Sequence, residues 1–80
     1  ERGERYGHFR KHAQISQSLK SCMVLIGSDG WNRLNCDQKE ALEMIQHKIA
    51  RILNGDPNYK DSWHDIAGYA TLISERLNDG

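Results

Sequence analysis

The chain has 80 residues, of which 38% are hydrophobic and 28% charged, a composition that predicts one small globular domain over residues 1–80 and excludes a disordered chain. Eleven basic residues balance eleven acidic ones, so the usual electrostatic argument for binding to nucleic acid is missing. The longest hydrophobic run, residues 22–26, is too short to span a membrane or to form the core of a signal peptide.

The first predicted helix runs from about residue 8 to residue 26. Its hydrophobic and small residues recur at steps of three and four, which places them on one face: Phe9, Ala13, Ser16, Leu19, Met23 and Ile26. We expect Gly27 to end this helix in the left-handed conformation that glycine adopts easily. Residues 28–32 are rich in turn formers and are expected to form a loop, with Trp31 and Leu34 covering the end of the helices.

The second predicted helix covers residues 37–54. Asp37 is a good N-cap residue, and Glu40 three positions later completes a capping-box pattern. A hydrophobic stripe follows, formed by Leu42, Ile45, Ile49, Ile52 and Leu53. Gly55 and Pro57 then end the helix, because proline cannot continue it.

The third predicted helix covers residues 61–78, with Asp61 as its expected cap. Its hydrophobic positions step by three and four, as in a packed helix seam: Trp63, Ile66, Ala70, Ile73 and Leu77. Gly68 lies away from this seam, and a glycine inside a helix costs about 1 kcal/mol relative to alanine. We therefore expect a second helix to pack closely on that side, as in a homodimer that completes a larger helical bundle.

Together these patterns predict an all-α fold of three main helices in a small bundle. We expect its core to contain ten residues: Phe9, Leu19, Leu42, Ile45, Ile49, Ile52, Trp63, Ile66, Ala70 and Ile73. Cys22 and Cys36 lack the spacing of a metal site, and we interpret them as free thiols in a reducing cytoplasm, with a single disulfide between them as the alternative. His8 and His12 are four positions apart, but no supporting ligand pattern accompanies them, so a solvated or hydrogen-bonded pair is expected.

Two pairs of carboxylates are the strongest candidates for chemistry. Glu40 and Glu43 form an E-x-x-E pair on the second predicted helix, and Asp61 and Asp65 share one face of the third. Carboxylate oxygens are the ligands that magnesium prefers, and this ion usually keeps bound phosphates in its coordination shell.

Two basic residues on the second predicted helix could meet those phosphates. Lys48 and Arg51 are three positions apart, and arginine can bind a phosphate group through two parallel hydrogen bonds. Lys48 lies at the edge of the hydrophobic stripe, where a lysine often extends its ammonium group to solvent without any ligand.

Each carboxylate also has a structural interpretation. Glu40 and Asp61 could act only as capping residues, and Glu43 points away from the hydrophobic stripe, as a solvated side chain would. Asp65 lies off the seam of its helix and could meet Lys48 or Arg51 across the helix pair. It is then either half of a structural ion pair or a magnesium ligand.

Three blocks carry a resemblance that covers nearly the whole chain: residues 2–7, 48–52 and 61–70. They resemble a family of small, uncharacterised, phage-encoded helical proteins with an R-G-x-x-Y-G start and a W-x-D-I-A-G-Y-A helix. Those proteins are distantly similar to the MazG-type all-α nucleoside triphosphate pyrophosphohydrolases. That superfamily binds magnesium with an E-x-x-E motif on one helix and an E-x-x-D motif on a later one, and works as dimers or tetramers.

The resemblance implies a magnesium site only in part. Glu40 and Glu43 match E-x-x-E, and Asp65 matches the last residue of E-x-x-D, but Ser62 stands where that motif has its glutamate, with Asp61 as the nearest substitute. A second alignment sets Lys48 and Arg51 on the E-x-x-E positions. A site of that kind would bind phosphates without hydrolysing them.

Two functions follow from these observations. The first is a small phage protein that binds a nucleotide or a host protein during infection, as a homodimer in the host cytoplasm. The alternative is a magnesium-dependent pyrophosphohydrolase that releases pyrophosphate from nucleoside triphosphates. In that enzyme Glu43 would orient or deprotonate the attacking water, Asp65 would help to hold the metal, and Lys48 and Arg51 would bind the phosphates.

Overall fold

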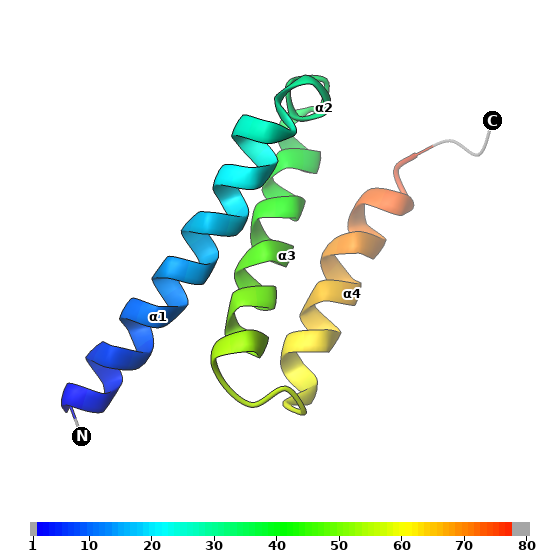
Figure 1. Cartoon of the computed structure of the whole chain (residues 1–80). Helices are drawn as coiled ribbons and strands as arrows, with labels where there is room; N and C mark the ends of the chain where they lie inside the picture. The colour runs from blue at the N-terminus through cyan, green and yellow to red at the C-terminus, as the bar shows by residue number, and fades with distance from the viewer. Residues whose placement is uncertain (1, 78–80) are drawn as a thin grey trace.

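The computed structural model describes the backbone of residues 2–77 and the side chains of residues 8–77. All regular elements of this part of the chain are helical, which confirms the all-α prediction (Figure 1). In chain order they are α1 (Arg2–Ser21), the π-helical turn η1 (Cys22–Ile26), α2 (Ser28–Asn32), α3 (Cys36–Asn54) and α4 (Lys60–Ser74).

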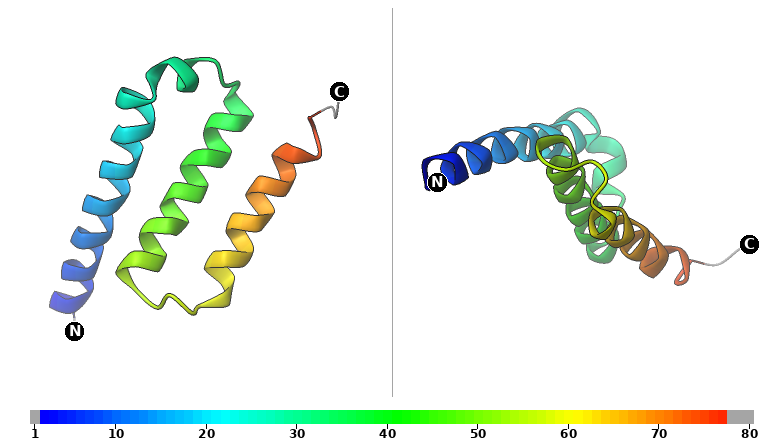
Figure 2. Two further views of the ribbon diagram at one scale, coloured as in Figure 1. Left: turned by 45° about the vertical axis from the view of Figure 1, so that its right-hand side comes forward. Right: turned by 90° about the horizontal axis from the view of Figure 1, so that it is seen from below.

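The three long helices lie side by side, with α3 between α1 and α4 (Figures 1 and 2). The molecule measures 51 × 28 × 15 Å. Its shortest dimension is close to the diameter of a single helix, about 10–12 Å with side chains. A single chain therefore forms one layer of three long helices, and the predicted completion of a larger bundle by a second chain stays a prediction.

The long first helix begins earlier and ends differently than expected. It starts at Arg2 and continues through Gly3 and Gly7, which the prediction places before the helix. Its C-terminal end is a π-turn in which Gly27 N donates to Cys22 O at 3.0 Å. The φ of Gly27 is −88°, so the predicted left-handed conformation is wrong. Glycine is needed there because a Cβ atom would lie only 2.9 Å from Met23 O.

The caps of α3 and α4 also differ from the predicted ones. Asn35 caps α3 by accepting from Gln38 N at 2.9 Å, and Gln38 Oε1 accepts from Asn35 N at 3.0 Å. The capping box thus lies two residues before the predicted pair Asp37 and Glu40. Helix α4 has Tyr59 at its N-cap without a side-chain cap, and it ends at Ser74 instead of residue 78.

The segment expected to be a loop contains the short helix α2. Trp31 N donates to Gly27 O at 2.8 Å, which gives this segment one helical turn. The ammonium group of Lys39 lies 6.0 Å from the Trp31 ring centre, so Trp31 packs against α3 at this end of the layer.

Burial is confined to the two flanks of α3 and the helix surfaces that face them. Ala41 and Ala50 are the buried hydrophobic residues, and three polar residues are buried with them: Ser16, Gln46 and Ser62. Of the ten predicted core residues, Phe9, Leu42, Trp63 and Ala70 are exposed, and the other six are half-buried: Leu19, Ile45, Ile49, Ile52, Ile66 and Ile73. The prediction fails because one layer leaves its broad faces uncovered, and the stripe from Leu42 to Leu53 runs along one of them.

None of the helices in the described range combines the length and the hydrophobicity that crossing a membrane would require. Cys22 and Cys36 are exposed free thiols, in agreement with the sequence interpretation. A Cβ atom at Gly68 would meet open space, so none of the described helices packs closely against this residue.

Candidate functional site

Polar side chains join α1 to α3 at several points of their contact. Near its middle, Gln46 Nε2 donates to Ser16 Oγ at 3.1 Å, and both residues are buried. One turn earlier on α3, Glu43 Oε1 lies 3.9 Å from Lys20 Nζ. Because residues 43 and 46 face α1, helical spacing places residues 47, 50 and 54 on the same flank of α3.

Two histidines meet one turn further along this flank. The rings of His12 and His47 lie edge to face with their centres 4.7 Å apart. Arg51, one turn after His47, donates from Nε to His47 Nε2 at 3.4 Å. An acceptor nitrogen carries no proton, so this contact requires His47 to be neutral with its proton on Nδ1.

These residues line a cleft of about 420 Å³ between α1, the C-terminal end of α3 and the loop that leads to α4. Seven of its lining residues carry aromatic, imidazole or charged groups: His8, Phe9, His12, His47, Arg51, Asp56 and Tyr59. The side chain of Asn54 closes the cleft on one side by donating from Nδ2 to His8 O at 2.6 Å. Pockets of about 300–1,000 Å³ are typical of small-molecule sites.

The charged groups that line the cleft beside the imidazoles are one guanidinium, of Arg51, and one carboxylate, of Asp56. Burial and the positive charge of Arg51 lower the pKa of His12 below its ordinary value of 6.5. Burial likewise lowers the pKa of His47, with smaller contributions from His12, Arg51 and Lys48. Both rings are therefore neutral at pH 7, while Arg51 keeps its charge.

The predicted carboxylates lie at different places along α3 and α4, and Glu40 also lines a pocket that faces α4. Glu40 and Glu43 line a shallow pocket on the α1 side of α3, together with Lys20. On the other side, Asp65 of α4 forms an ion pair with Lys48 at 2.9 Å, and Asp61 accepts from Tyr59 Oη at 3.1 Å. This hydrogen bond and the negative charge of Asp61 raise the pKa of Tyr59.

The predicted magnesium ligands do not form one cluster in the part of the chain that the structure describes. Within residues 8–77, no three His, Cys, Asp or Glu side chains come close enough to share a metal ion. Glu43 and Asp65 instead each face a lysine, which neutralises the charge that would attract a cation. The fold thus brings Glu40 near Glu43 but does not bring this pair together with Asp61 and Asp65.

The two predicted phosphate-binding residues take different places. Lys48 points to α4 and pairs with Asp65, whereas Arg51 lines the cleft. Sequence reasoning missed His12 and His47 as partners of Arg51. The spacing of four between His47 and Arg51 was visible, and so was that between His8 and His12. Only the packing of α1 against α3 shows that the two pairs face each other.

Comparison with known proteins gives the family and nothing more specific. Residues 1–77 match the family described as a domain of unknown function (DUF6378), so the chain belongs to that family. Neither the curated proteins nor the solved structures include one that matches the chain.

Proposed function

We propose that this member of the DUF6378 family is a small binding module that holds a nucleotide by its phosphate groups in the cleft between α1 and α3. The observation that carries the proposal is the position of Arg51. It is one of the two basic residues that the sequence assigns to phosphates, and it opens on a cleft that also contains imidazole and aromatic side chains. An arginine fork binds phosphate oxygens, and aromatic rings such as Phe9 and Tyr59 can stack on a base.

The proposal favours binding over hydrolysis. A pyrophosphohydrolase would need carboxylates grouped around magnesium, and in one chain Glu43 and Asp65 are engaged with lysines on opposite sides of α3. The resemblance to small phage-encoded proteins supports a role during infection, inside the host cell. The alignment that sets Lys48 and Arg51 on the E-x-x-E positions agrees with this choice, because it replaces metal ligands by basic residues.

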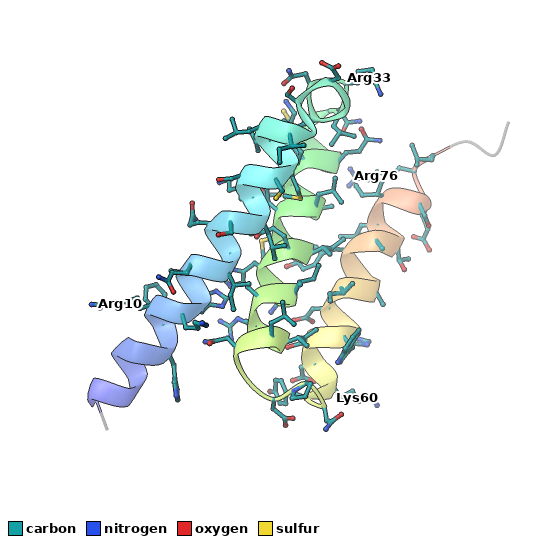
Figure 3. All side chains as sticks on the ribbon, in the orientation of Figure 1. Arg10, Arg33, Lys60 and Arg76 are labelled. Atoms are coloured by element: carbon teal, nitrogen blue, oxygen red, sulfur yellow. The ribbon has the colours of Figure 1, made fainter. Side chains whose placement is uncertain are left out.

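The test is calorimetric titration with AMP, dATP and ATP, with and without magnesium. We expect binding that Arg51→Gln weakens by about tenfold, the usual effect of losing a charge-assisted hydrogen bond. Arg33→Gln is the matched control, because Arg33 is far from the cleft. Arg33 lies beside α2 at one end of the molecule, and Lys60, which begins α4 next to the cleft, lies at the other end (Figure 3). Equal affinities of the two variants would place the ligand elsewhere.

The hydrolase alternative has its own measurement. We expect no pyrophosphate release from a panel of nucleoside triphosphates with magnesium or manganese. Release that Glu43→Gln abolishes would support the enzyme instead, and would require carboxylates of a second chain to complete the metal site.

We also propose that the chain forms a homodimer through the broad hydrophobic face of its helical layer. A groove of about 300 Å³ crosses this face, lined mainly by hydrophobic residues of α3 and α4 that include Leu42, Ile45, Ala70 and Leu77. Leu42 and Leu77 are 38% and 54% exposed, respectively. Ile49 and Leu53 extend the stripe by further turns of α3.

The size of the face supports a second copy as its occupant. The whole layer is 51 Å long and 28 Å wide, so it has room for the area of about 800 Å² that each partner buries in a standard interface. A chain with zero net charge presents little repulsion to its own copy. A dimer would also supply the hydrophobic burial that one layer lacks, since no large side chain among the described residues is fully buried.

Light scattering after size-exclusion chromatography measures this association. We expect a dimer for the parent chain and a monomer for Leu42→Lys. Leu72→Lys is the control: Leu72 of α4 is also an exposed leucine, at 54%, but it lines a different pocket, beside Asp37 and Arg76. A monomeric parent chain at micromolar concentration would contradict the dimer and leave the face to a partner such as a host protein.

A further inference from the structure

His12 and His47 occupy the centre of the cleft from two different helices. His12 projects from α1 and His47 from α3, and their rings touch edge to face. His47 also accepts from Arg51 Nε. The same cleft is lined by His8, one turn before His12 on α1. Nitrogen groups from both helices thus surround one opening of about 420 Å³.

We propose that His12 and His47 are phosphate-binding residues, and that they take up protons from solvent when a dianionic phosphate group binds beside Arg51. This inference rests on the proposed function, whose ligand it narrows to one that presents a dianionic phosphate. Once His47 Nε2 is protonated, it can no longer accept from Arg51. The guanidinium then turns its donors to the anion, and the imidazolium rings donate to it as well.

The charged groups around the histidines support this behaviour. Burial is the main cause that lowers the pKa of His47, followed by His12, Arg51 and Lys48, and an anion in the cleft would offset the contributions of these positive charges. Glu43, one turn before His47, is paired with Lys20 of α1 and so contributes less negative charge to the ring. Among the hydrogen bonds of the described side chains, none joins a carboxylate to either imidazole.

The loop that closes the cleft contributes two further titratable groups. Asp56 accepts from Asn58 N at 2.9 Å, so its carboxylate is held by its own turn. Tyr59 donates to Asp61 and keeps its proton at neutral pH, because its pKa is raised. Asp56 lines the cleft without a hydrogen bond to either imidazole, so a dianionic ligand beside Arg51 would add negative charge that the two rings lack.

The test uses sulfate as the ligand, because sulfate stays a dianion across the neutral pH range. A phosphate group has a second pKa of about 6, so its own protonation would overlap with that of the histidines. Nuclear magnetic resonance would follow the imidazole protons of His12, His47 and His64 while pH is varied, with and without sulfate. We expect sulfate to raise the pKa of His12 and His47. His64, exposed on α4, is the internal control and should not change.

Sulfate should therefore bind more tightly at pH 5.5 than at pH 8. If binding raises the pKa of one histidine by one unit, the affinity should differ by about tenfold. His12→Asn and His47→Asn should reduce this pH dependence, whereas His64→Asn should keep it. Arg51→Gln should weaken binding at both pH values. Circular dichroism melts of each variant would show that the helices are retained.

Two results would overturn the inference in distinguishable ways. If AMP and sulfate bind at Arg51 but neither histidine changes its pKa, the proposed function stands and the role of the histidines is wrong. If neither AMP nor sulfate binds at any pH, both proposals fail.

Discussion

Helix α3 contacts its two neighbours through different kinds of side chain. On the α1 side the contact is polar, with the buried pair Ser16 and Gln46 at its centre. On the α4 side the centre of the contact is hydrophobic, with Ala41 and Ile73 between two grooves. Two ion pairs, Lys48–Asp65 and Asp37–Arg76, lie towards the two ends of this contact.

The difference separates the two roles proposed for the molecule. The polar contact with α1 fixes how the two helices pack, because each buried donor needs its acceptor. The same contact can also open into a cleft that holds a charged ligand. The seam with α4 continues directly into the hydrophobic face, and residues on such a face gain most from being covered by another chain. Four substitutions or titrations can test this division.

The largest effect is expected at Ala50, which is completely buried on the flank of α3 that faces α1. Ala50→Leu should destabilise the fold by about 2–3 kcal/mol, because there is no space for three additional carbon atoms. Urea unfolding followed by circular dichroism measures the loss. The same change at the exposed Ala67 of α4 is the control, and an equal loss there would contradict tight packing at Ala50.

The next effect concerns the polar pair of the α1 seam. Gln46→Ala should cost about 1–2 kcal/mol, because it leaves the hydroxyl of Ser16 buried without its partner. The double variant Ser16→Ala with Gln46→Leu removes both polar groups and should recover most of that stability. If the double variant is less stable than Gln46→Ala, the hydrogen bond is not the source of the cost.

A smaller effect is expected for the ion pair of the α4 seam. Asp65→Asn should lower stability by about 1 kcal/mol or less, because the carboxylate of Asp65 is 41% exposed and solvent screens the pair. The loss should shrink in high salt, and Asp61→Asn serves as the control on the same helix. An increase in stability after Asp65→Asn would instead indicate repulsion among carboxylates, as in a metal site.

The smallest effect is the pH dependence of the ligand-free chain. Because the pKa values of His12 and His47 are lowered on folding, the unfolded chain binds more protons than the folded one below pH 6.5. Stability should be constant above about pH 7.5 and fall as pH decreases through 6.5 towards 5. Thermal melts should show a weaker fall for His12→Asn than for His64→Asn, and identical profiles would contradict the histidine contribution.

The sequence by itself determined the helical class and the approximate extent of the three long helices. Helix-forming periodicity and turn residues are local, so they could be predicted without knowing which helices are neighbours. The same locality made Arg51 visible as a basic residue one turn after His47. It also explains the errors at the caps, where Asn35–Gln38 and Asp37–Glu40 offer the same pattern two residues apart.

Only the tertiary structure decided which side of each helix is covered. A hydrophobic stripe in the sequence shows that one face of a helix favours burial, but it does not show what covers that face. In this single layer of helices, Leu42 of the stripe is exposed and Ile49 is half-buried. The separation of the carboxylates and the meeting of His12 with His47 have the same origin. Each depends on how α1 and α4 pack against opposite sides of α3, and contacts between residues far apart in the chain are not encoded in local spacing.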